Sequence, residues 1–143
     1  MMISNFAGML LAALITLSPL VHANDWVTPI GAPHGVAGRV VIVDVFTYDC
    51  INCQHVVPEL RHLYAHYSRR DLQILGIHTP ELSYERVRSN VIKNLAAQGI
   101  VWPVAFDPDA QLWARYGRLV QIFVGEGYDR KLSALIRKLV AEH

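Results

Sequence analysis

The stretch VVIVDVFTYDCINC, residues 40–53, decides the fold of this chain. Residues 40–47 are dense in β-branched side chains and apolar on both faces, a pattern typical of a strand buried in the middle of a sheet. Two cysteines follow, Cys50 and Cys53, and apolar side chains then recur at helical spacing over residues 52–67. The cysteines therefore lie where a buried strand passes into an amphipathic helix.

The same periodicities continue along the chain, so that strands alternate with helices. Three further strands are predicted at 72–78, 104–106 and 119–124, and three further helices at 83–98, at 110–116 and around 132–139. Residues 24–38 are rich in glycine and proline and form an irregular lead-in. This alternation, without an internal repeat or a linker, predicts one α/β domain with at least one right-handed parallel crossover.

The composition excludes several classes of protein. The 143 residues include 13 Lys+Arg against 12 Asp+Glu and no basic block, so the chain lacks the positive patch that nucleic-acid binding requires. With 52% hydrophobic and 17% charged residues, it is not intrinsically disordered. Its 2 cysteines are too few for a multi-bridge disulfide scaffold or for a zinc site closed by thiolates alone.

The first residues have the pattern of a secretory signal. An apolar to weakly polar run at 6–17 is shorter than the ~20 residues that span a bilayer, and Val21 and Ala23 are small residues where signal peptidase reads the chain. We expect a signal at 1–23, a mature domain at 24–143 and no stable membrane insertion after cleavage. An uncleaved anchor or a buried N-terminal helix is the alternative. Export would allow the cysteine pair to persist as a disulfide.

The position of the cysteines at a helix N-terminus predicts redox chemistry. The unpaired N–H groups and partial positive charge of the helix stabilise a thiolate, which is the nucleophile in disulfide exchange. Cys53, one turn beyond Cys50, can close the ring by attacking the mixed disulfide. So small a ring removes little chain entropy, which disfavours a purely structural bridge, and a metal site would need further ligands.

The spacing of four residues around this pair resembles the thioredoxin superfamily, in its TlpA-like, redoxin-type periplasmic branch. Asp44 lies six residues before Cys50, and Pro58 lies five residues after Cys53, as in that family. The stretches GIHTPE and PVAFD further along also resemble this branch, including its inserted helix and strand, and GEG with the last helix matches its C-terminal end. The resemblance covers nearly all of the mature chain and implies a thioredoxin-like fold.

The resemblance also implies a function, that of a periplasmic thiol–disulfide oxidoreductase acting on protein thiols and disulfides. Cys50 would attack or receive the substrate thiol, Cys53 would resolve the mixed disulfide, and Asp44 would relay the proton. No bound cofactor or metal is expected, and a membrane protein is expected to donate electrons. Burial of the Asp44 carboxyl would raise its pKa towards the working pH.

The residues around Cys50 predict a reductant. Asp49 places a negative charge beside the thiol, and neither Ile51 nor Asn52 supplies a cation to offset it. A less stabilised thiolate makes the disulfide harder to reduce. We therefore expect a reduction potential nearer that of thioredoxin, about −270 mV, than that of DsbA, about −120 mV.

One feature of the family is absent from this sequence. Family members carry an aromatic residue and a cis-proline in the loop that faces the cysteines and docks the substrate. Here residues 116–118, Tyr-Gly-Arg, run straight into an apolar stretch, and no proline follows Pro108. We expect this loop and about one strand, ~5–6 residues, to be missing.

The missing segment has a consequence for the sheet. Trp102-Pro103 fits the inserted strand better than the cis-proline position, so we expect that bond to be trans. The sheet would then be one strand short, with a gap or an exposed edge unless residues 119–124 take the vacant place.

Two other interpretations stay open. The chain can be a carrier of a metal or thiol ligand, using Cys50, Cys53 and a histidine, or an inactive, degraded thioredoxin-like paralogue. Thr47 stands three residues before Cys50, as in a peroxidase site, but Val43 stands where that pattern has a proline, which disfavours peroxidase chemistry. A polar face of the cysteine helix contains His55, Glu59, His62 and His66, for which a solvated surface is the simpler interpretation than a metal site.

Overall fold

A single four-stranded sheet organises the computed structural model, which describes residues 2–5, 25–31, 33, 39–112 and 129–142. The strands lie in the order β1-β2-β3-β4. They are β1 (Met2–Asn5), β2 (Val40–Phe46), β3 (Leu72–His78) and β4 (Val104–Phe106). β2, β3 and β4 are parallel to one another, whereas β1 runs antiparallel to β2. The α/β class and these three parallel strands agree with the sequence prediction.

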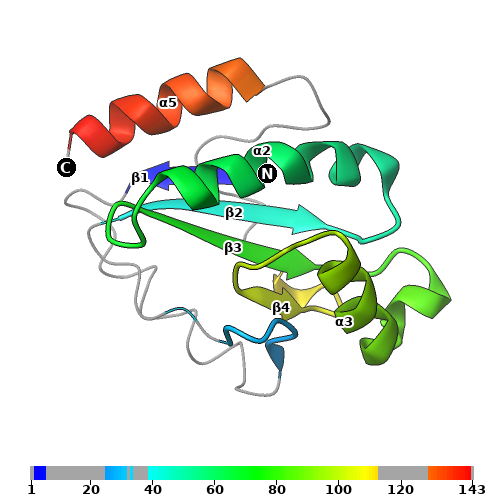
Figure 1. Ribbon diagram of the computed structural model, residues 1–143. Helices are drawn as coiled ribbons and strands as arrows, with labels where there is room; N and C mark the ends of the chain where they lie inside the picture. Colours follow the sequence, from blue (N-terminus) through cyan, green and yellow to red (C-terminus); the bar gives the residue numbers. More distant parts are fainter. Residues whose placement is uncertain (1, 6–24, 32, 34–38, 113–128, 143) are drawn as a thin grey trace.

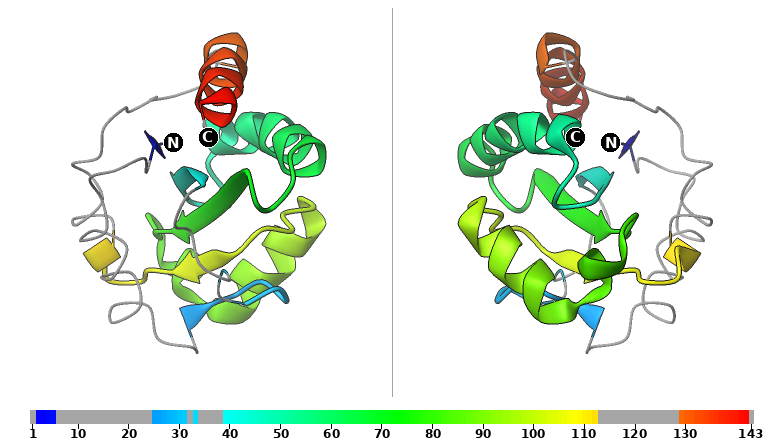
Figure 2. Two further views of the ribbon diagram at one scale, coloured as in Figure 1. Left: turned by 90° about the vertical axis from the view of Figure 1, so that its left-hand side faces the viewer. Right: turned by 90° about the vertical axis from the view of Figure 1, so that its right-hand side faces the viewer.

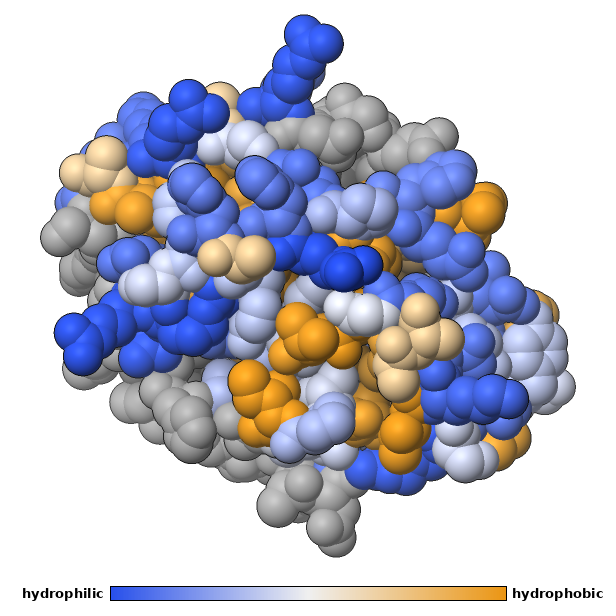
Figure 3. Space-filling model, in the orientation of Figure 1, coloured by the Kyte–Doolittle hydropathy of each residue, from blue (hydrophilic) through white to orange (hydrophobic). Residues whose placement is uncertain are grey.

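Helices cover the sheet on both sides. Helix α2 (Ile51–His66) lies over β2 and β3, and α5 (Asp129–Ala141) lies beside α2, as Figure 1 shows. Helix α3 (Arg88–Ala97) lies on the opposite side of the sheet (Figure 2). Because both faces are covered, all seven residues of β3 and six of the seven of β2 are buried. Polar residues cover most of the face in Figure 3, and apolar residues gather below α2, over β4 and α3.

The core explains why the helical periodicities predict these helices. The buried core residues that these helices contribute are Leu60 and Leu63 of α2, Val91 and Leu95 of α3, and Leu132 and Ile136 of α5. Each set recurs every three or four residues and so forms one apolar stripe on its helix. Burial of such side chains contributes about 1.5–3 kcal/mol each, which gives the layers their stability.

The helix predicted at 83–98 is divided in two, and that prediction was wrong. A short 3-10 helix, η2 (Ser83–Arg86), precedes α3, and Val87 between them is extended. The side chain of Glu85 turns inward and accepts hydrogen bonds from the backbone N–H groups of Glu81 and Leu82, at 2.9 and 2.8 Å. These bonds tighten the first turn and keep it separate from α3.

The outer side of β2 is occupied by a strand that the sequence analysis does not predict. β1 pairs with β2 in the register Met2↔Val43 to Asn5↔Val40. An edge expected to be vacant, or filled by residues 119–124, is thus paired with a segment that lies inside the predicted signal. Three predictions fall outside the described residues: the strand at 119–124, the absence of a loop near residues 116–118, and the part of the helix predicted at 110–116 that follows residue 112.

Two further expectations bear on the described part of the chain. No peptide bond there is cis, so the Trp102–Pro103 bond is trans. No described helix is both long enough and apolar enough to span a membrane.

Candidate redox site

Cys50 is the N-cap residue of α2. Its backbone is extended, its N–H donates to the Thr47 carbonyl at 3.3 Å, and its carbonyl accepts from Gln54 N at 3.0 Å. Its Sγ accepts a hydrogen bond from the backbone N–H of Cys53 at 3.4 Å. A sulfur in the N-cap position satisfies one of the unpaired N–H groups of the helix, and the helix has no acidic residue in its first turn. This geometry stabilises negative charge on the sulfur.

Cys53 lies one turn along α2 and packs against the core cluster. Both cysteines are half-buried free thiols. Burial raises the pKa of Cys53 to about 12, and a hydrogen bond with the Cys50 side chain and the negative charge of Asp44 act in the same direction. The pair is therefore asymmetric, with one thiol at the end of the helix and one held protonated beneath it.

Asp44 lies in β2, where its side chain is only 8% exposed. Burial raises its pKa from 3.8 to about 6. The negative charge of Asp44 is one of the causes that raise the pKa of Cys53. A carboxyl that titrates near neutral pH beside a protonated thiol is able to take up and return a proton.

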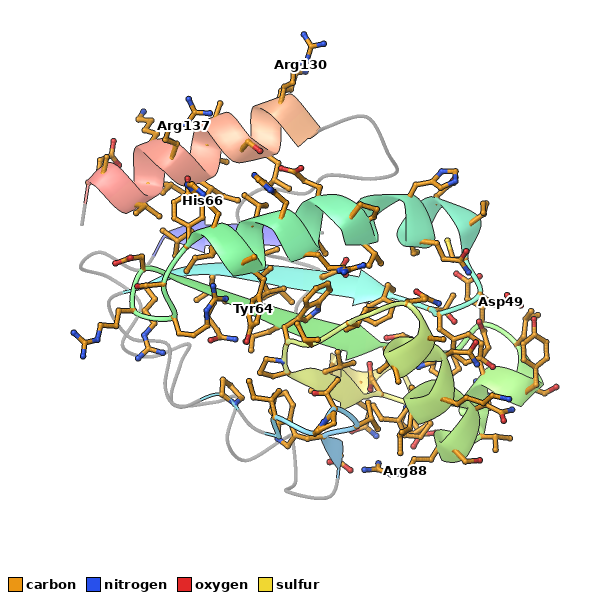
Figure 4. The ribbon with its side chains drawn as sticks, in the orientation of Figure 1. Asp49, Tyr64, His66, Arg88, Arg130 and Arg137 are labelled. Atoms are coloured by element: carbon orange, nitrogen blue, oxygen red, sulfur yellow. The ribbon has the colours of Figure 1, made fainter. Side chains whose placement is uncertain are left out.

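Residues 47–49 form the loop that leads from β2 into α2, called here the pre-cysteine loop. The carbonyl of Tyr48 accepts hydrogen bonds from Gln54 Nε2 at 2.9 Å and from Gln98 Nε2 at 2.8 Å. Figure 4 shows Asp49 at this junction, facing the segment that contains η2. The Tyr84 hydroxyl donates to the Asp49 carboxylate, and this bond raises the pKa of Tyr84 to about 12.

Glu85 is a residue of this site that sequence reasoning missed. Only 1% of its surface is exposed, and it accepts a hydrogen bond from the Thr47 hydroxyl. Nothing in the ELSYER stretch distinguishes it from the charged residues of an exposed helix face. Its burial depends on the turn at η2, which brings a distant segment against the pre-cysteine loop.

His78 packs against the pre-cysteine loop through the ring of Tyr48. His78, at the end of β3, is fully buried and stacks on Tyr48 with ring centroids 5.4 Å apart. Burial lowers the pKa of His78 to about 4, so the ring is neutral at pH 7. Among the residues that the structure describes, neither ring nitrogen has a hydrogen-bond partner. This histidine packs as an aromatic side chain.

Two of the three histidines of α2, His62 and His66, lie away from the cysteines. His62 and His66 stack on each other at 5.9 Å, and Figure 4 shows His66 at the end of α2 remote from Asp49. Sixteen residues of α-helix extend over ~24 Å, so His66 lies far from Cys50. Within the described ranges, no three His, Cys, Asp or Glu side chains are grouped to hold a metal ion.

Comparison with known proteins gives a family. The AhpC/TSA family matches residues 32–133. Protein DipZ of Mycobacterium tuberculosis is 34% identical over 117 residues, which cover 72% of this chain and 17% of DipZ. The chain thus spans about a sixth of the length of this relative.

Solved structures show the same fold at lower identity. A thiol-disulfide isomerase from Corynebacterium glutamicum superposes with a TM-score of 0.71 at 23% identity, over 86% of this chain and 95% of that one. A secreted disulfide oxidoreductase of Mycobacterium tuberculosis has a TM-score of 0.59 at 18% identity, over 78% of this chain and 92% of that one. The chain belongs to the AhpC/TSA family of the thioredoxin superfamily and has the thioredoxin-like α/β fold that its cysteine segment predicts.

Proposed function

We propose that the protein is an exported thiol–disulfide oxidoreductase whose redox centre is the Cys50–Cys53 pair. The observation that carries this proposal is the position of Cys50, half-exposed at the N-cap of α2, with its Sγ 3.4 Å from the backbone nitrogen of Cys53. A helix N-terminus favours the thiolate, and the partial exposure gives a substrate disulfide access to it.

The reaction transfers two electrons from the cysteine pair to a protein disulfide. The Cys50 thiolate attacks one substrate sulfur, a mixed disulfide forms, and the other substrate sulfur leaves as a thiolate. The Cys53 thiol then gives its proton to Asp44 and attacks Cys50 Sγ. The second substrate thiolate leaves and is protonated, and the Cys50–Cys53 disulfide remains.

The raised pKa of Cys53 is compatible with this second step. Part of the pKa shift comes from the hydrogen bond with Cys50 and from the charge of Cys50. When Cys50 forms a mixed disulfide, it loses its thiolate charge and the hydrogen bond changes. The thiol of Cys53 is therefore easier to deprotonate when it has to react. The raised pKa of Asp44, about 6, supports the role of proton acceptor that we propose for it.

The proposed direction of electron flow is towards the substrate. Asp49 is next to Cys50, and its negative charge is held there by the Tyr84 hydroxyl. A fixed negative charge disfavours the thiolate and so favours the oxidised pair, which is the property of a reductant. A membrane protein would return electrons to the pair, and export is supported by the secreted oxidoreductase that shares the fold.

A thiol-exchange reaction fits the loop better than peroxidase chemistry. The hydroxyl of Thr47 donates its hydrogen bond to Glu85 and is therefore not free to donate one to Cys50. The test of the proposal is insulin reduction with dithiothreitol as the electron source, comparing the wild-type protein with Cys50→Ser. The proposal requires faster insulin precipitation with the wild type than with the variant, and equal rates would overturn it.

A further inference from the structure

Glu85 connects two segments that lie far apart in the sequence. One carboxylate oxygen accepts from the Thr47 hydroxyl, and the other accepts from the backbone N–H groups of Glu81 and Leu82. The carboxylate therefore joins the start of the pre-cysteine loop to the turn before η2.

This buried carboxylate is negatively charged. Burial alone raises the pKa of Glu85, but the hydrogen bonds from the Thr47 hydroxyl and from the backbone N–H groups of Leu82 and Glu81 outweigh it and lower the pKa below the ordinary value. A carboxylate that accepts several backbone hydrogen bonds is stabilised in its charged form. At neutral pH the loop before Cys50 therefore surrounds a fixed negative charge.

The neighbouring residue strengthens the same connection. The Tyr84 hydroxyl donates a hydrogen bond to the Asp49 carboxylate, and Glu85 accepts one from the Thr47 hydroxyl. Two successive residues of η2 thus hold the loop from which Cys50 begins α2. The backbone N–H of Cys50 bonds to the Thr47 carbonyl, so the position of Thr47 also fixes that of Cys50.

We propose that Glu85 is a positioning residue for the Cys50–Cys53 pair, which holds the pre-cysteine loop and makes the disulfide harder to reduce. Two effects act in the same direction. A fixed loop keeps the two sulfurs oriented for ring closure, which favours the disulfide. The negative charge disfavours the thiolate of the reduced state. The inference rests on the proposed function only in requiring that the pair forms a disulfide.

The test is the equilibrium of the full-length protein with glutathione. Two molecules of glutathione reduce the Cys50–Cys53 disulfide and form one glutathione disulfide, so the thiol content of the protein at each ratio gives the equilibrium constant. The variants are Glu85→Ala, which removes acceptor and charge, and Glu85→Gln, which keeps one acceptor oxygen. Glu81→Gln is the matched control, since its exposed carboxylate lies in the same segment.

Glu85→Ala is expected to raise the equilibrium constant for reduction at least tenfold, which is a potential about 30 mV less negative. Glu85→Gln is expected to raise it about threefold, because a charge that acts on the thiolate from across the loop contributes of the order of half a pKa unit. Glu81→Gln is expected to stay within twofold of the wild type. A folded Glu85→Ala variant with a lower melting temperature but an unchanged constant would overturn the proposal and leave a structural role.

Thr47→Val gives a second route if Glu85→Ala does not fold. It removes one hydrogen bond to the carboxylate while leaving the charge, and its effect should not add to that of Glu85→Gln, because both act on one contact. Full additivity would overturn the proposal. Insulin reduction is measured in parallel. Its absence in the wild type would refute the proposed function, whereas the glutathione equilibrium would still test Glu85.

Discussion

Replacing Asp44 by asparagine should have opposite effects on stability and on reactivity: it should stabilise the fold and slow the reaction of Cys53. The pKa of Asp44 rises from 3.8 to about 6, and each unit corresponds to 1.36 kcal/mol. The charged side chain therefore lowers the free energy of unfolding at pH 7 by about 3 kcal/mol. Asp44→Asn removes the charge but keeps the shape. We expect the variant to be more stable by up to this amount, about 10 °C in melting temperature.

The extra stability of Asp44→Asn relative to the wild type increases as pH rises. Between pH 4 and pH 6 the native protein binds a proton at Asp44 that the unfolded chain lacks, so stability falls as pH rises through this window. The difference between Asp44→Asn and the wild type should therefore be about 3 kcal/mol at pH 7 and below about 1 kcal/mol at pH 4.

His78 has the opposite slope over nearly the same window. Its pKa is lowered from 6.5 to about 4, so the unfolded chain binds the extra proton and stability falls as pH drops. The contributions of Asp44 and His78 almost cancel in the wild type. In Asp44→Asn only the histidine remains, so the variant should lose about 3 kcal/mol between pH 7 and pH 4.

The assay is urea unfolding of the reduced protein at pH 4, 5.5 and 7, followed by circular dichroism. Exposed Asp109→Asn is the control and should change nothing. The same Asp44→Asn variant should resolve mixed disulfides at least about a hundredfold more slowly, because it lacks the proton acceptor. Equal stability at all pH values would refute the burial argument, and an unchanged resolving rate would refute the proton-transfer role.

Three further predictions follow from packing. His78→Phe should keep the stack with Tyr48 and be more stable at pH 4 than at pH 7 in urea titrations, because only the opposite slope of Asp44 remains; a flat profile like that of the wild type would contradict it. Gly76→Ala should lower the free energy of unfolding by about 1–3 kcal/mol, because a Cβ would approach Val104 Cγ2 to 2.8 Å. Residues 24–143 alone should melt in one cooperative transition, since the described core runs from Val27 to Ile136; a melt without one would favour a degraded paralogue.

The parts of the fold that were predicted from the sequence depend on local patterns. The bounds of β3 and β4 are the predicted ones. β2 ends one residue earlier than predicted, and α2 begins and ends one residue earlier. The agreement is close because each element has an unbroken periodicity between clear turn residues. Backbone geometry fixes the period of apolar side chains at two residues in a strand and 3.6 in a helix, so a single sequence is enough to detect it.

The parts that were not predicted depend on contacts between distant segments. The pairing of β1 with β2 joins residues about forty positions apart and has no local signature. The break before α3 follows from the burial of Glu85, whose partners include Thr47, 38 positions earlier. Cys50, Cys53 and Asp44 could be identified from the sequence because they lie at fixed spacings within one strand–helix unit. Their roles remain proposals.

The central claim, that Cys50 attacks and Cys53 resolves, is tested most directly by trapping the intermediate. The chain has 2 cysteines, so the Cys53→Ser variant retains Cys50 alone and any disulfide-linked adduct must form there. Reduced Cys53→Ser mixed with an unfolded protein substrate that contains a disulfide should accumulate a mixed disulfide, visible by mass spectrometry, whereas the wild type should release it. No adduct with Cys53→Ser, or an equal and lasting adduct with the wild type, would contradict the account.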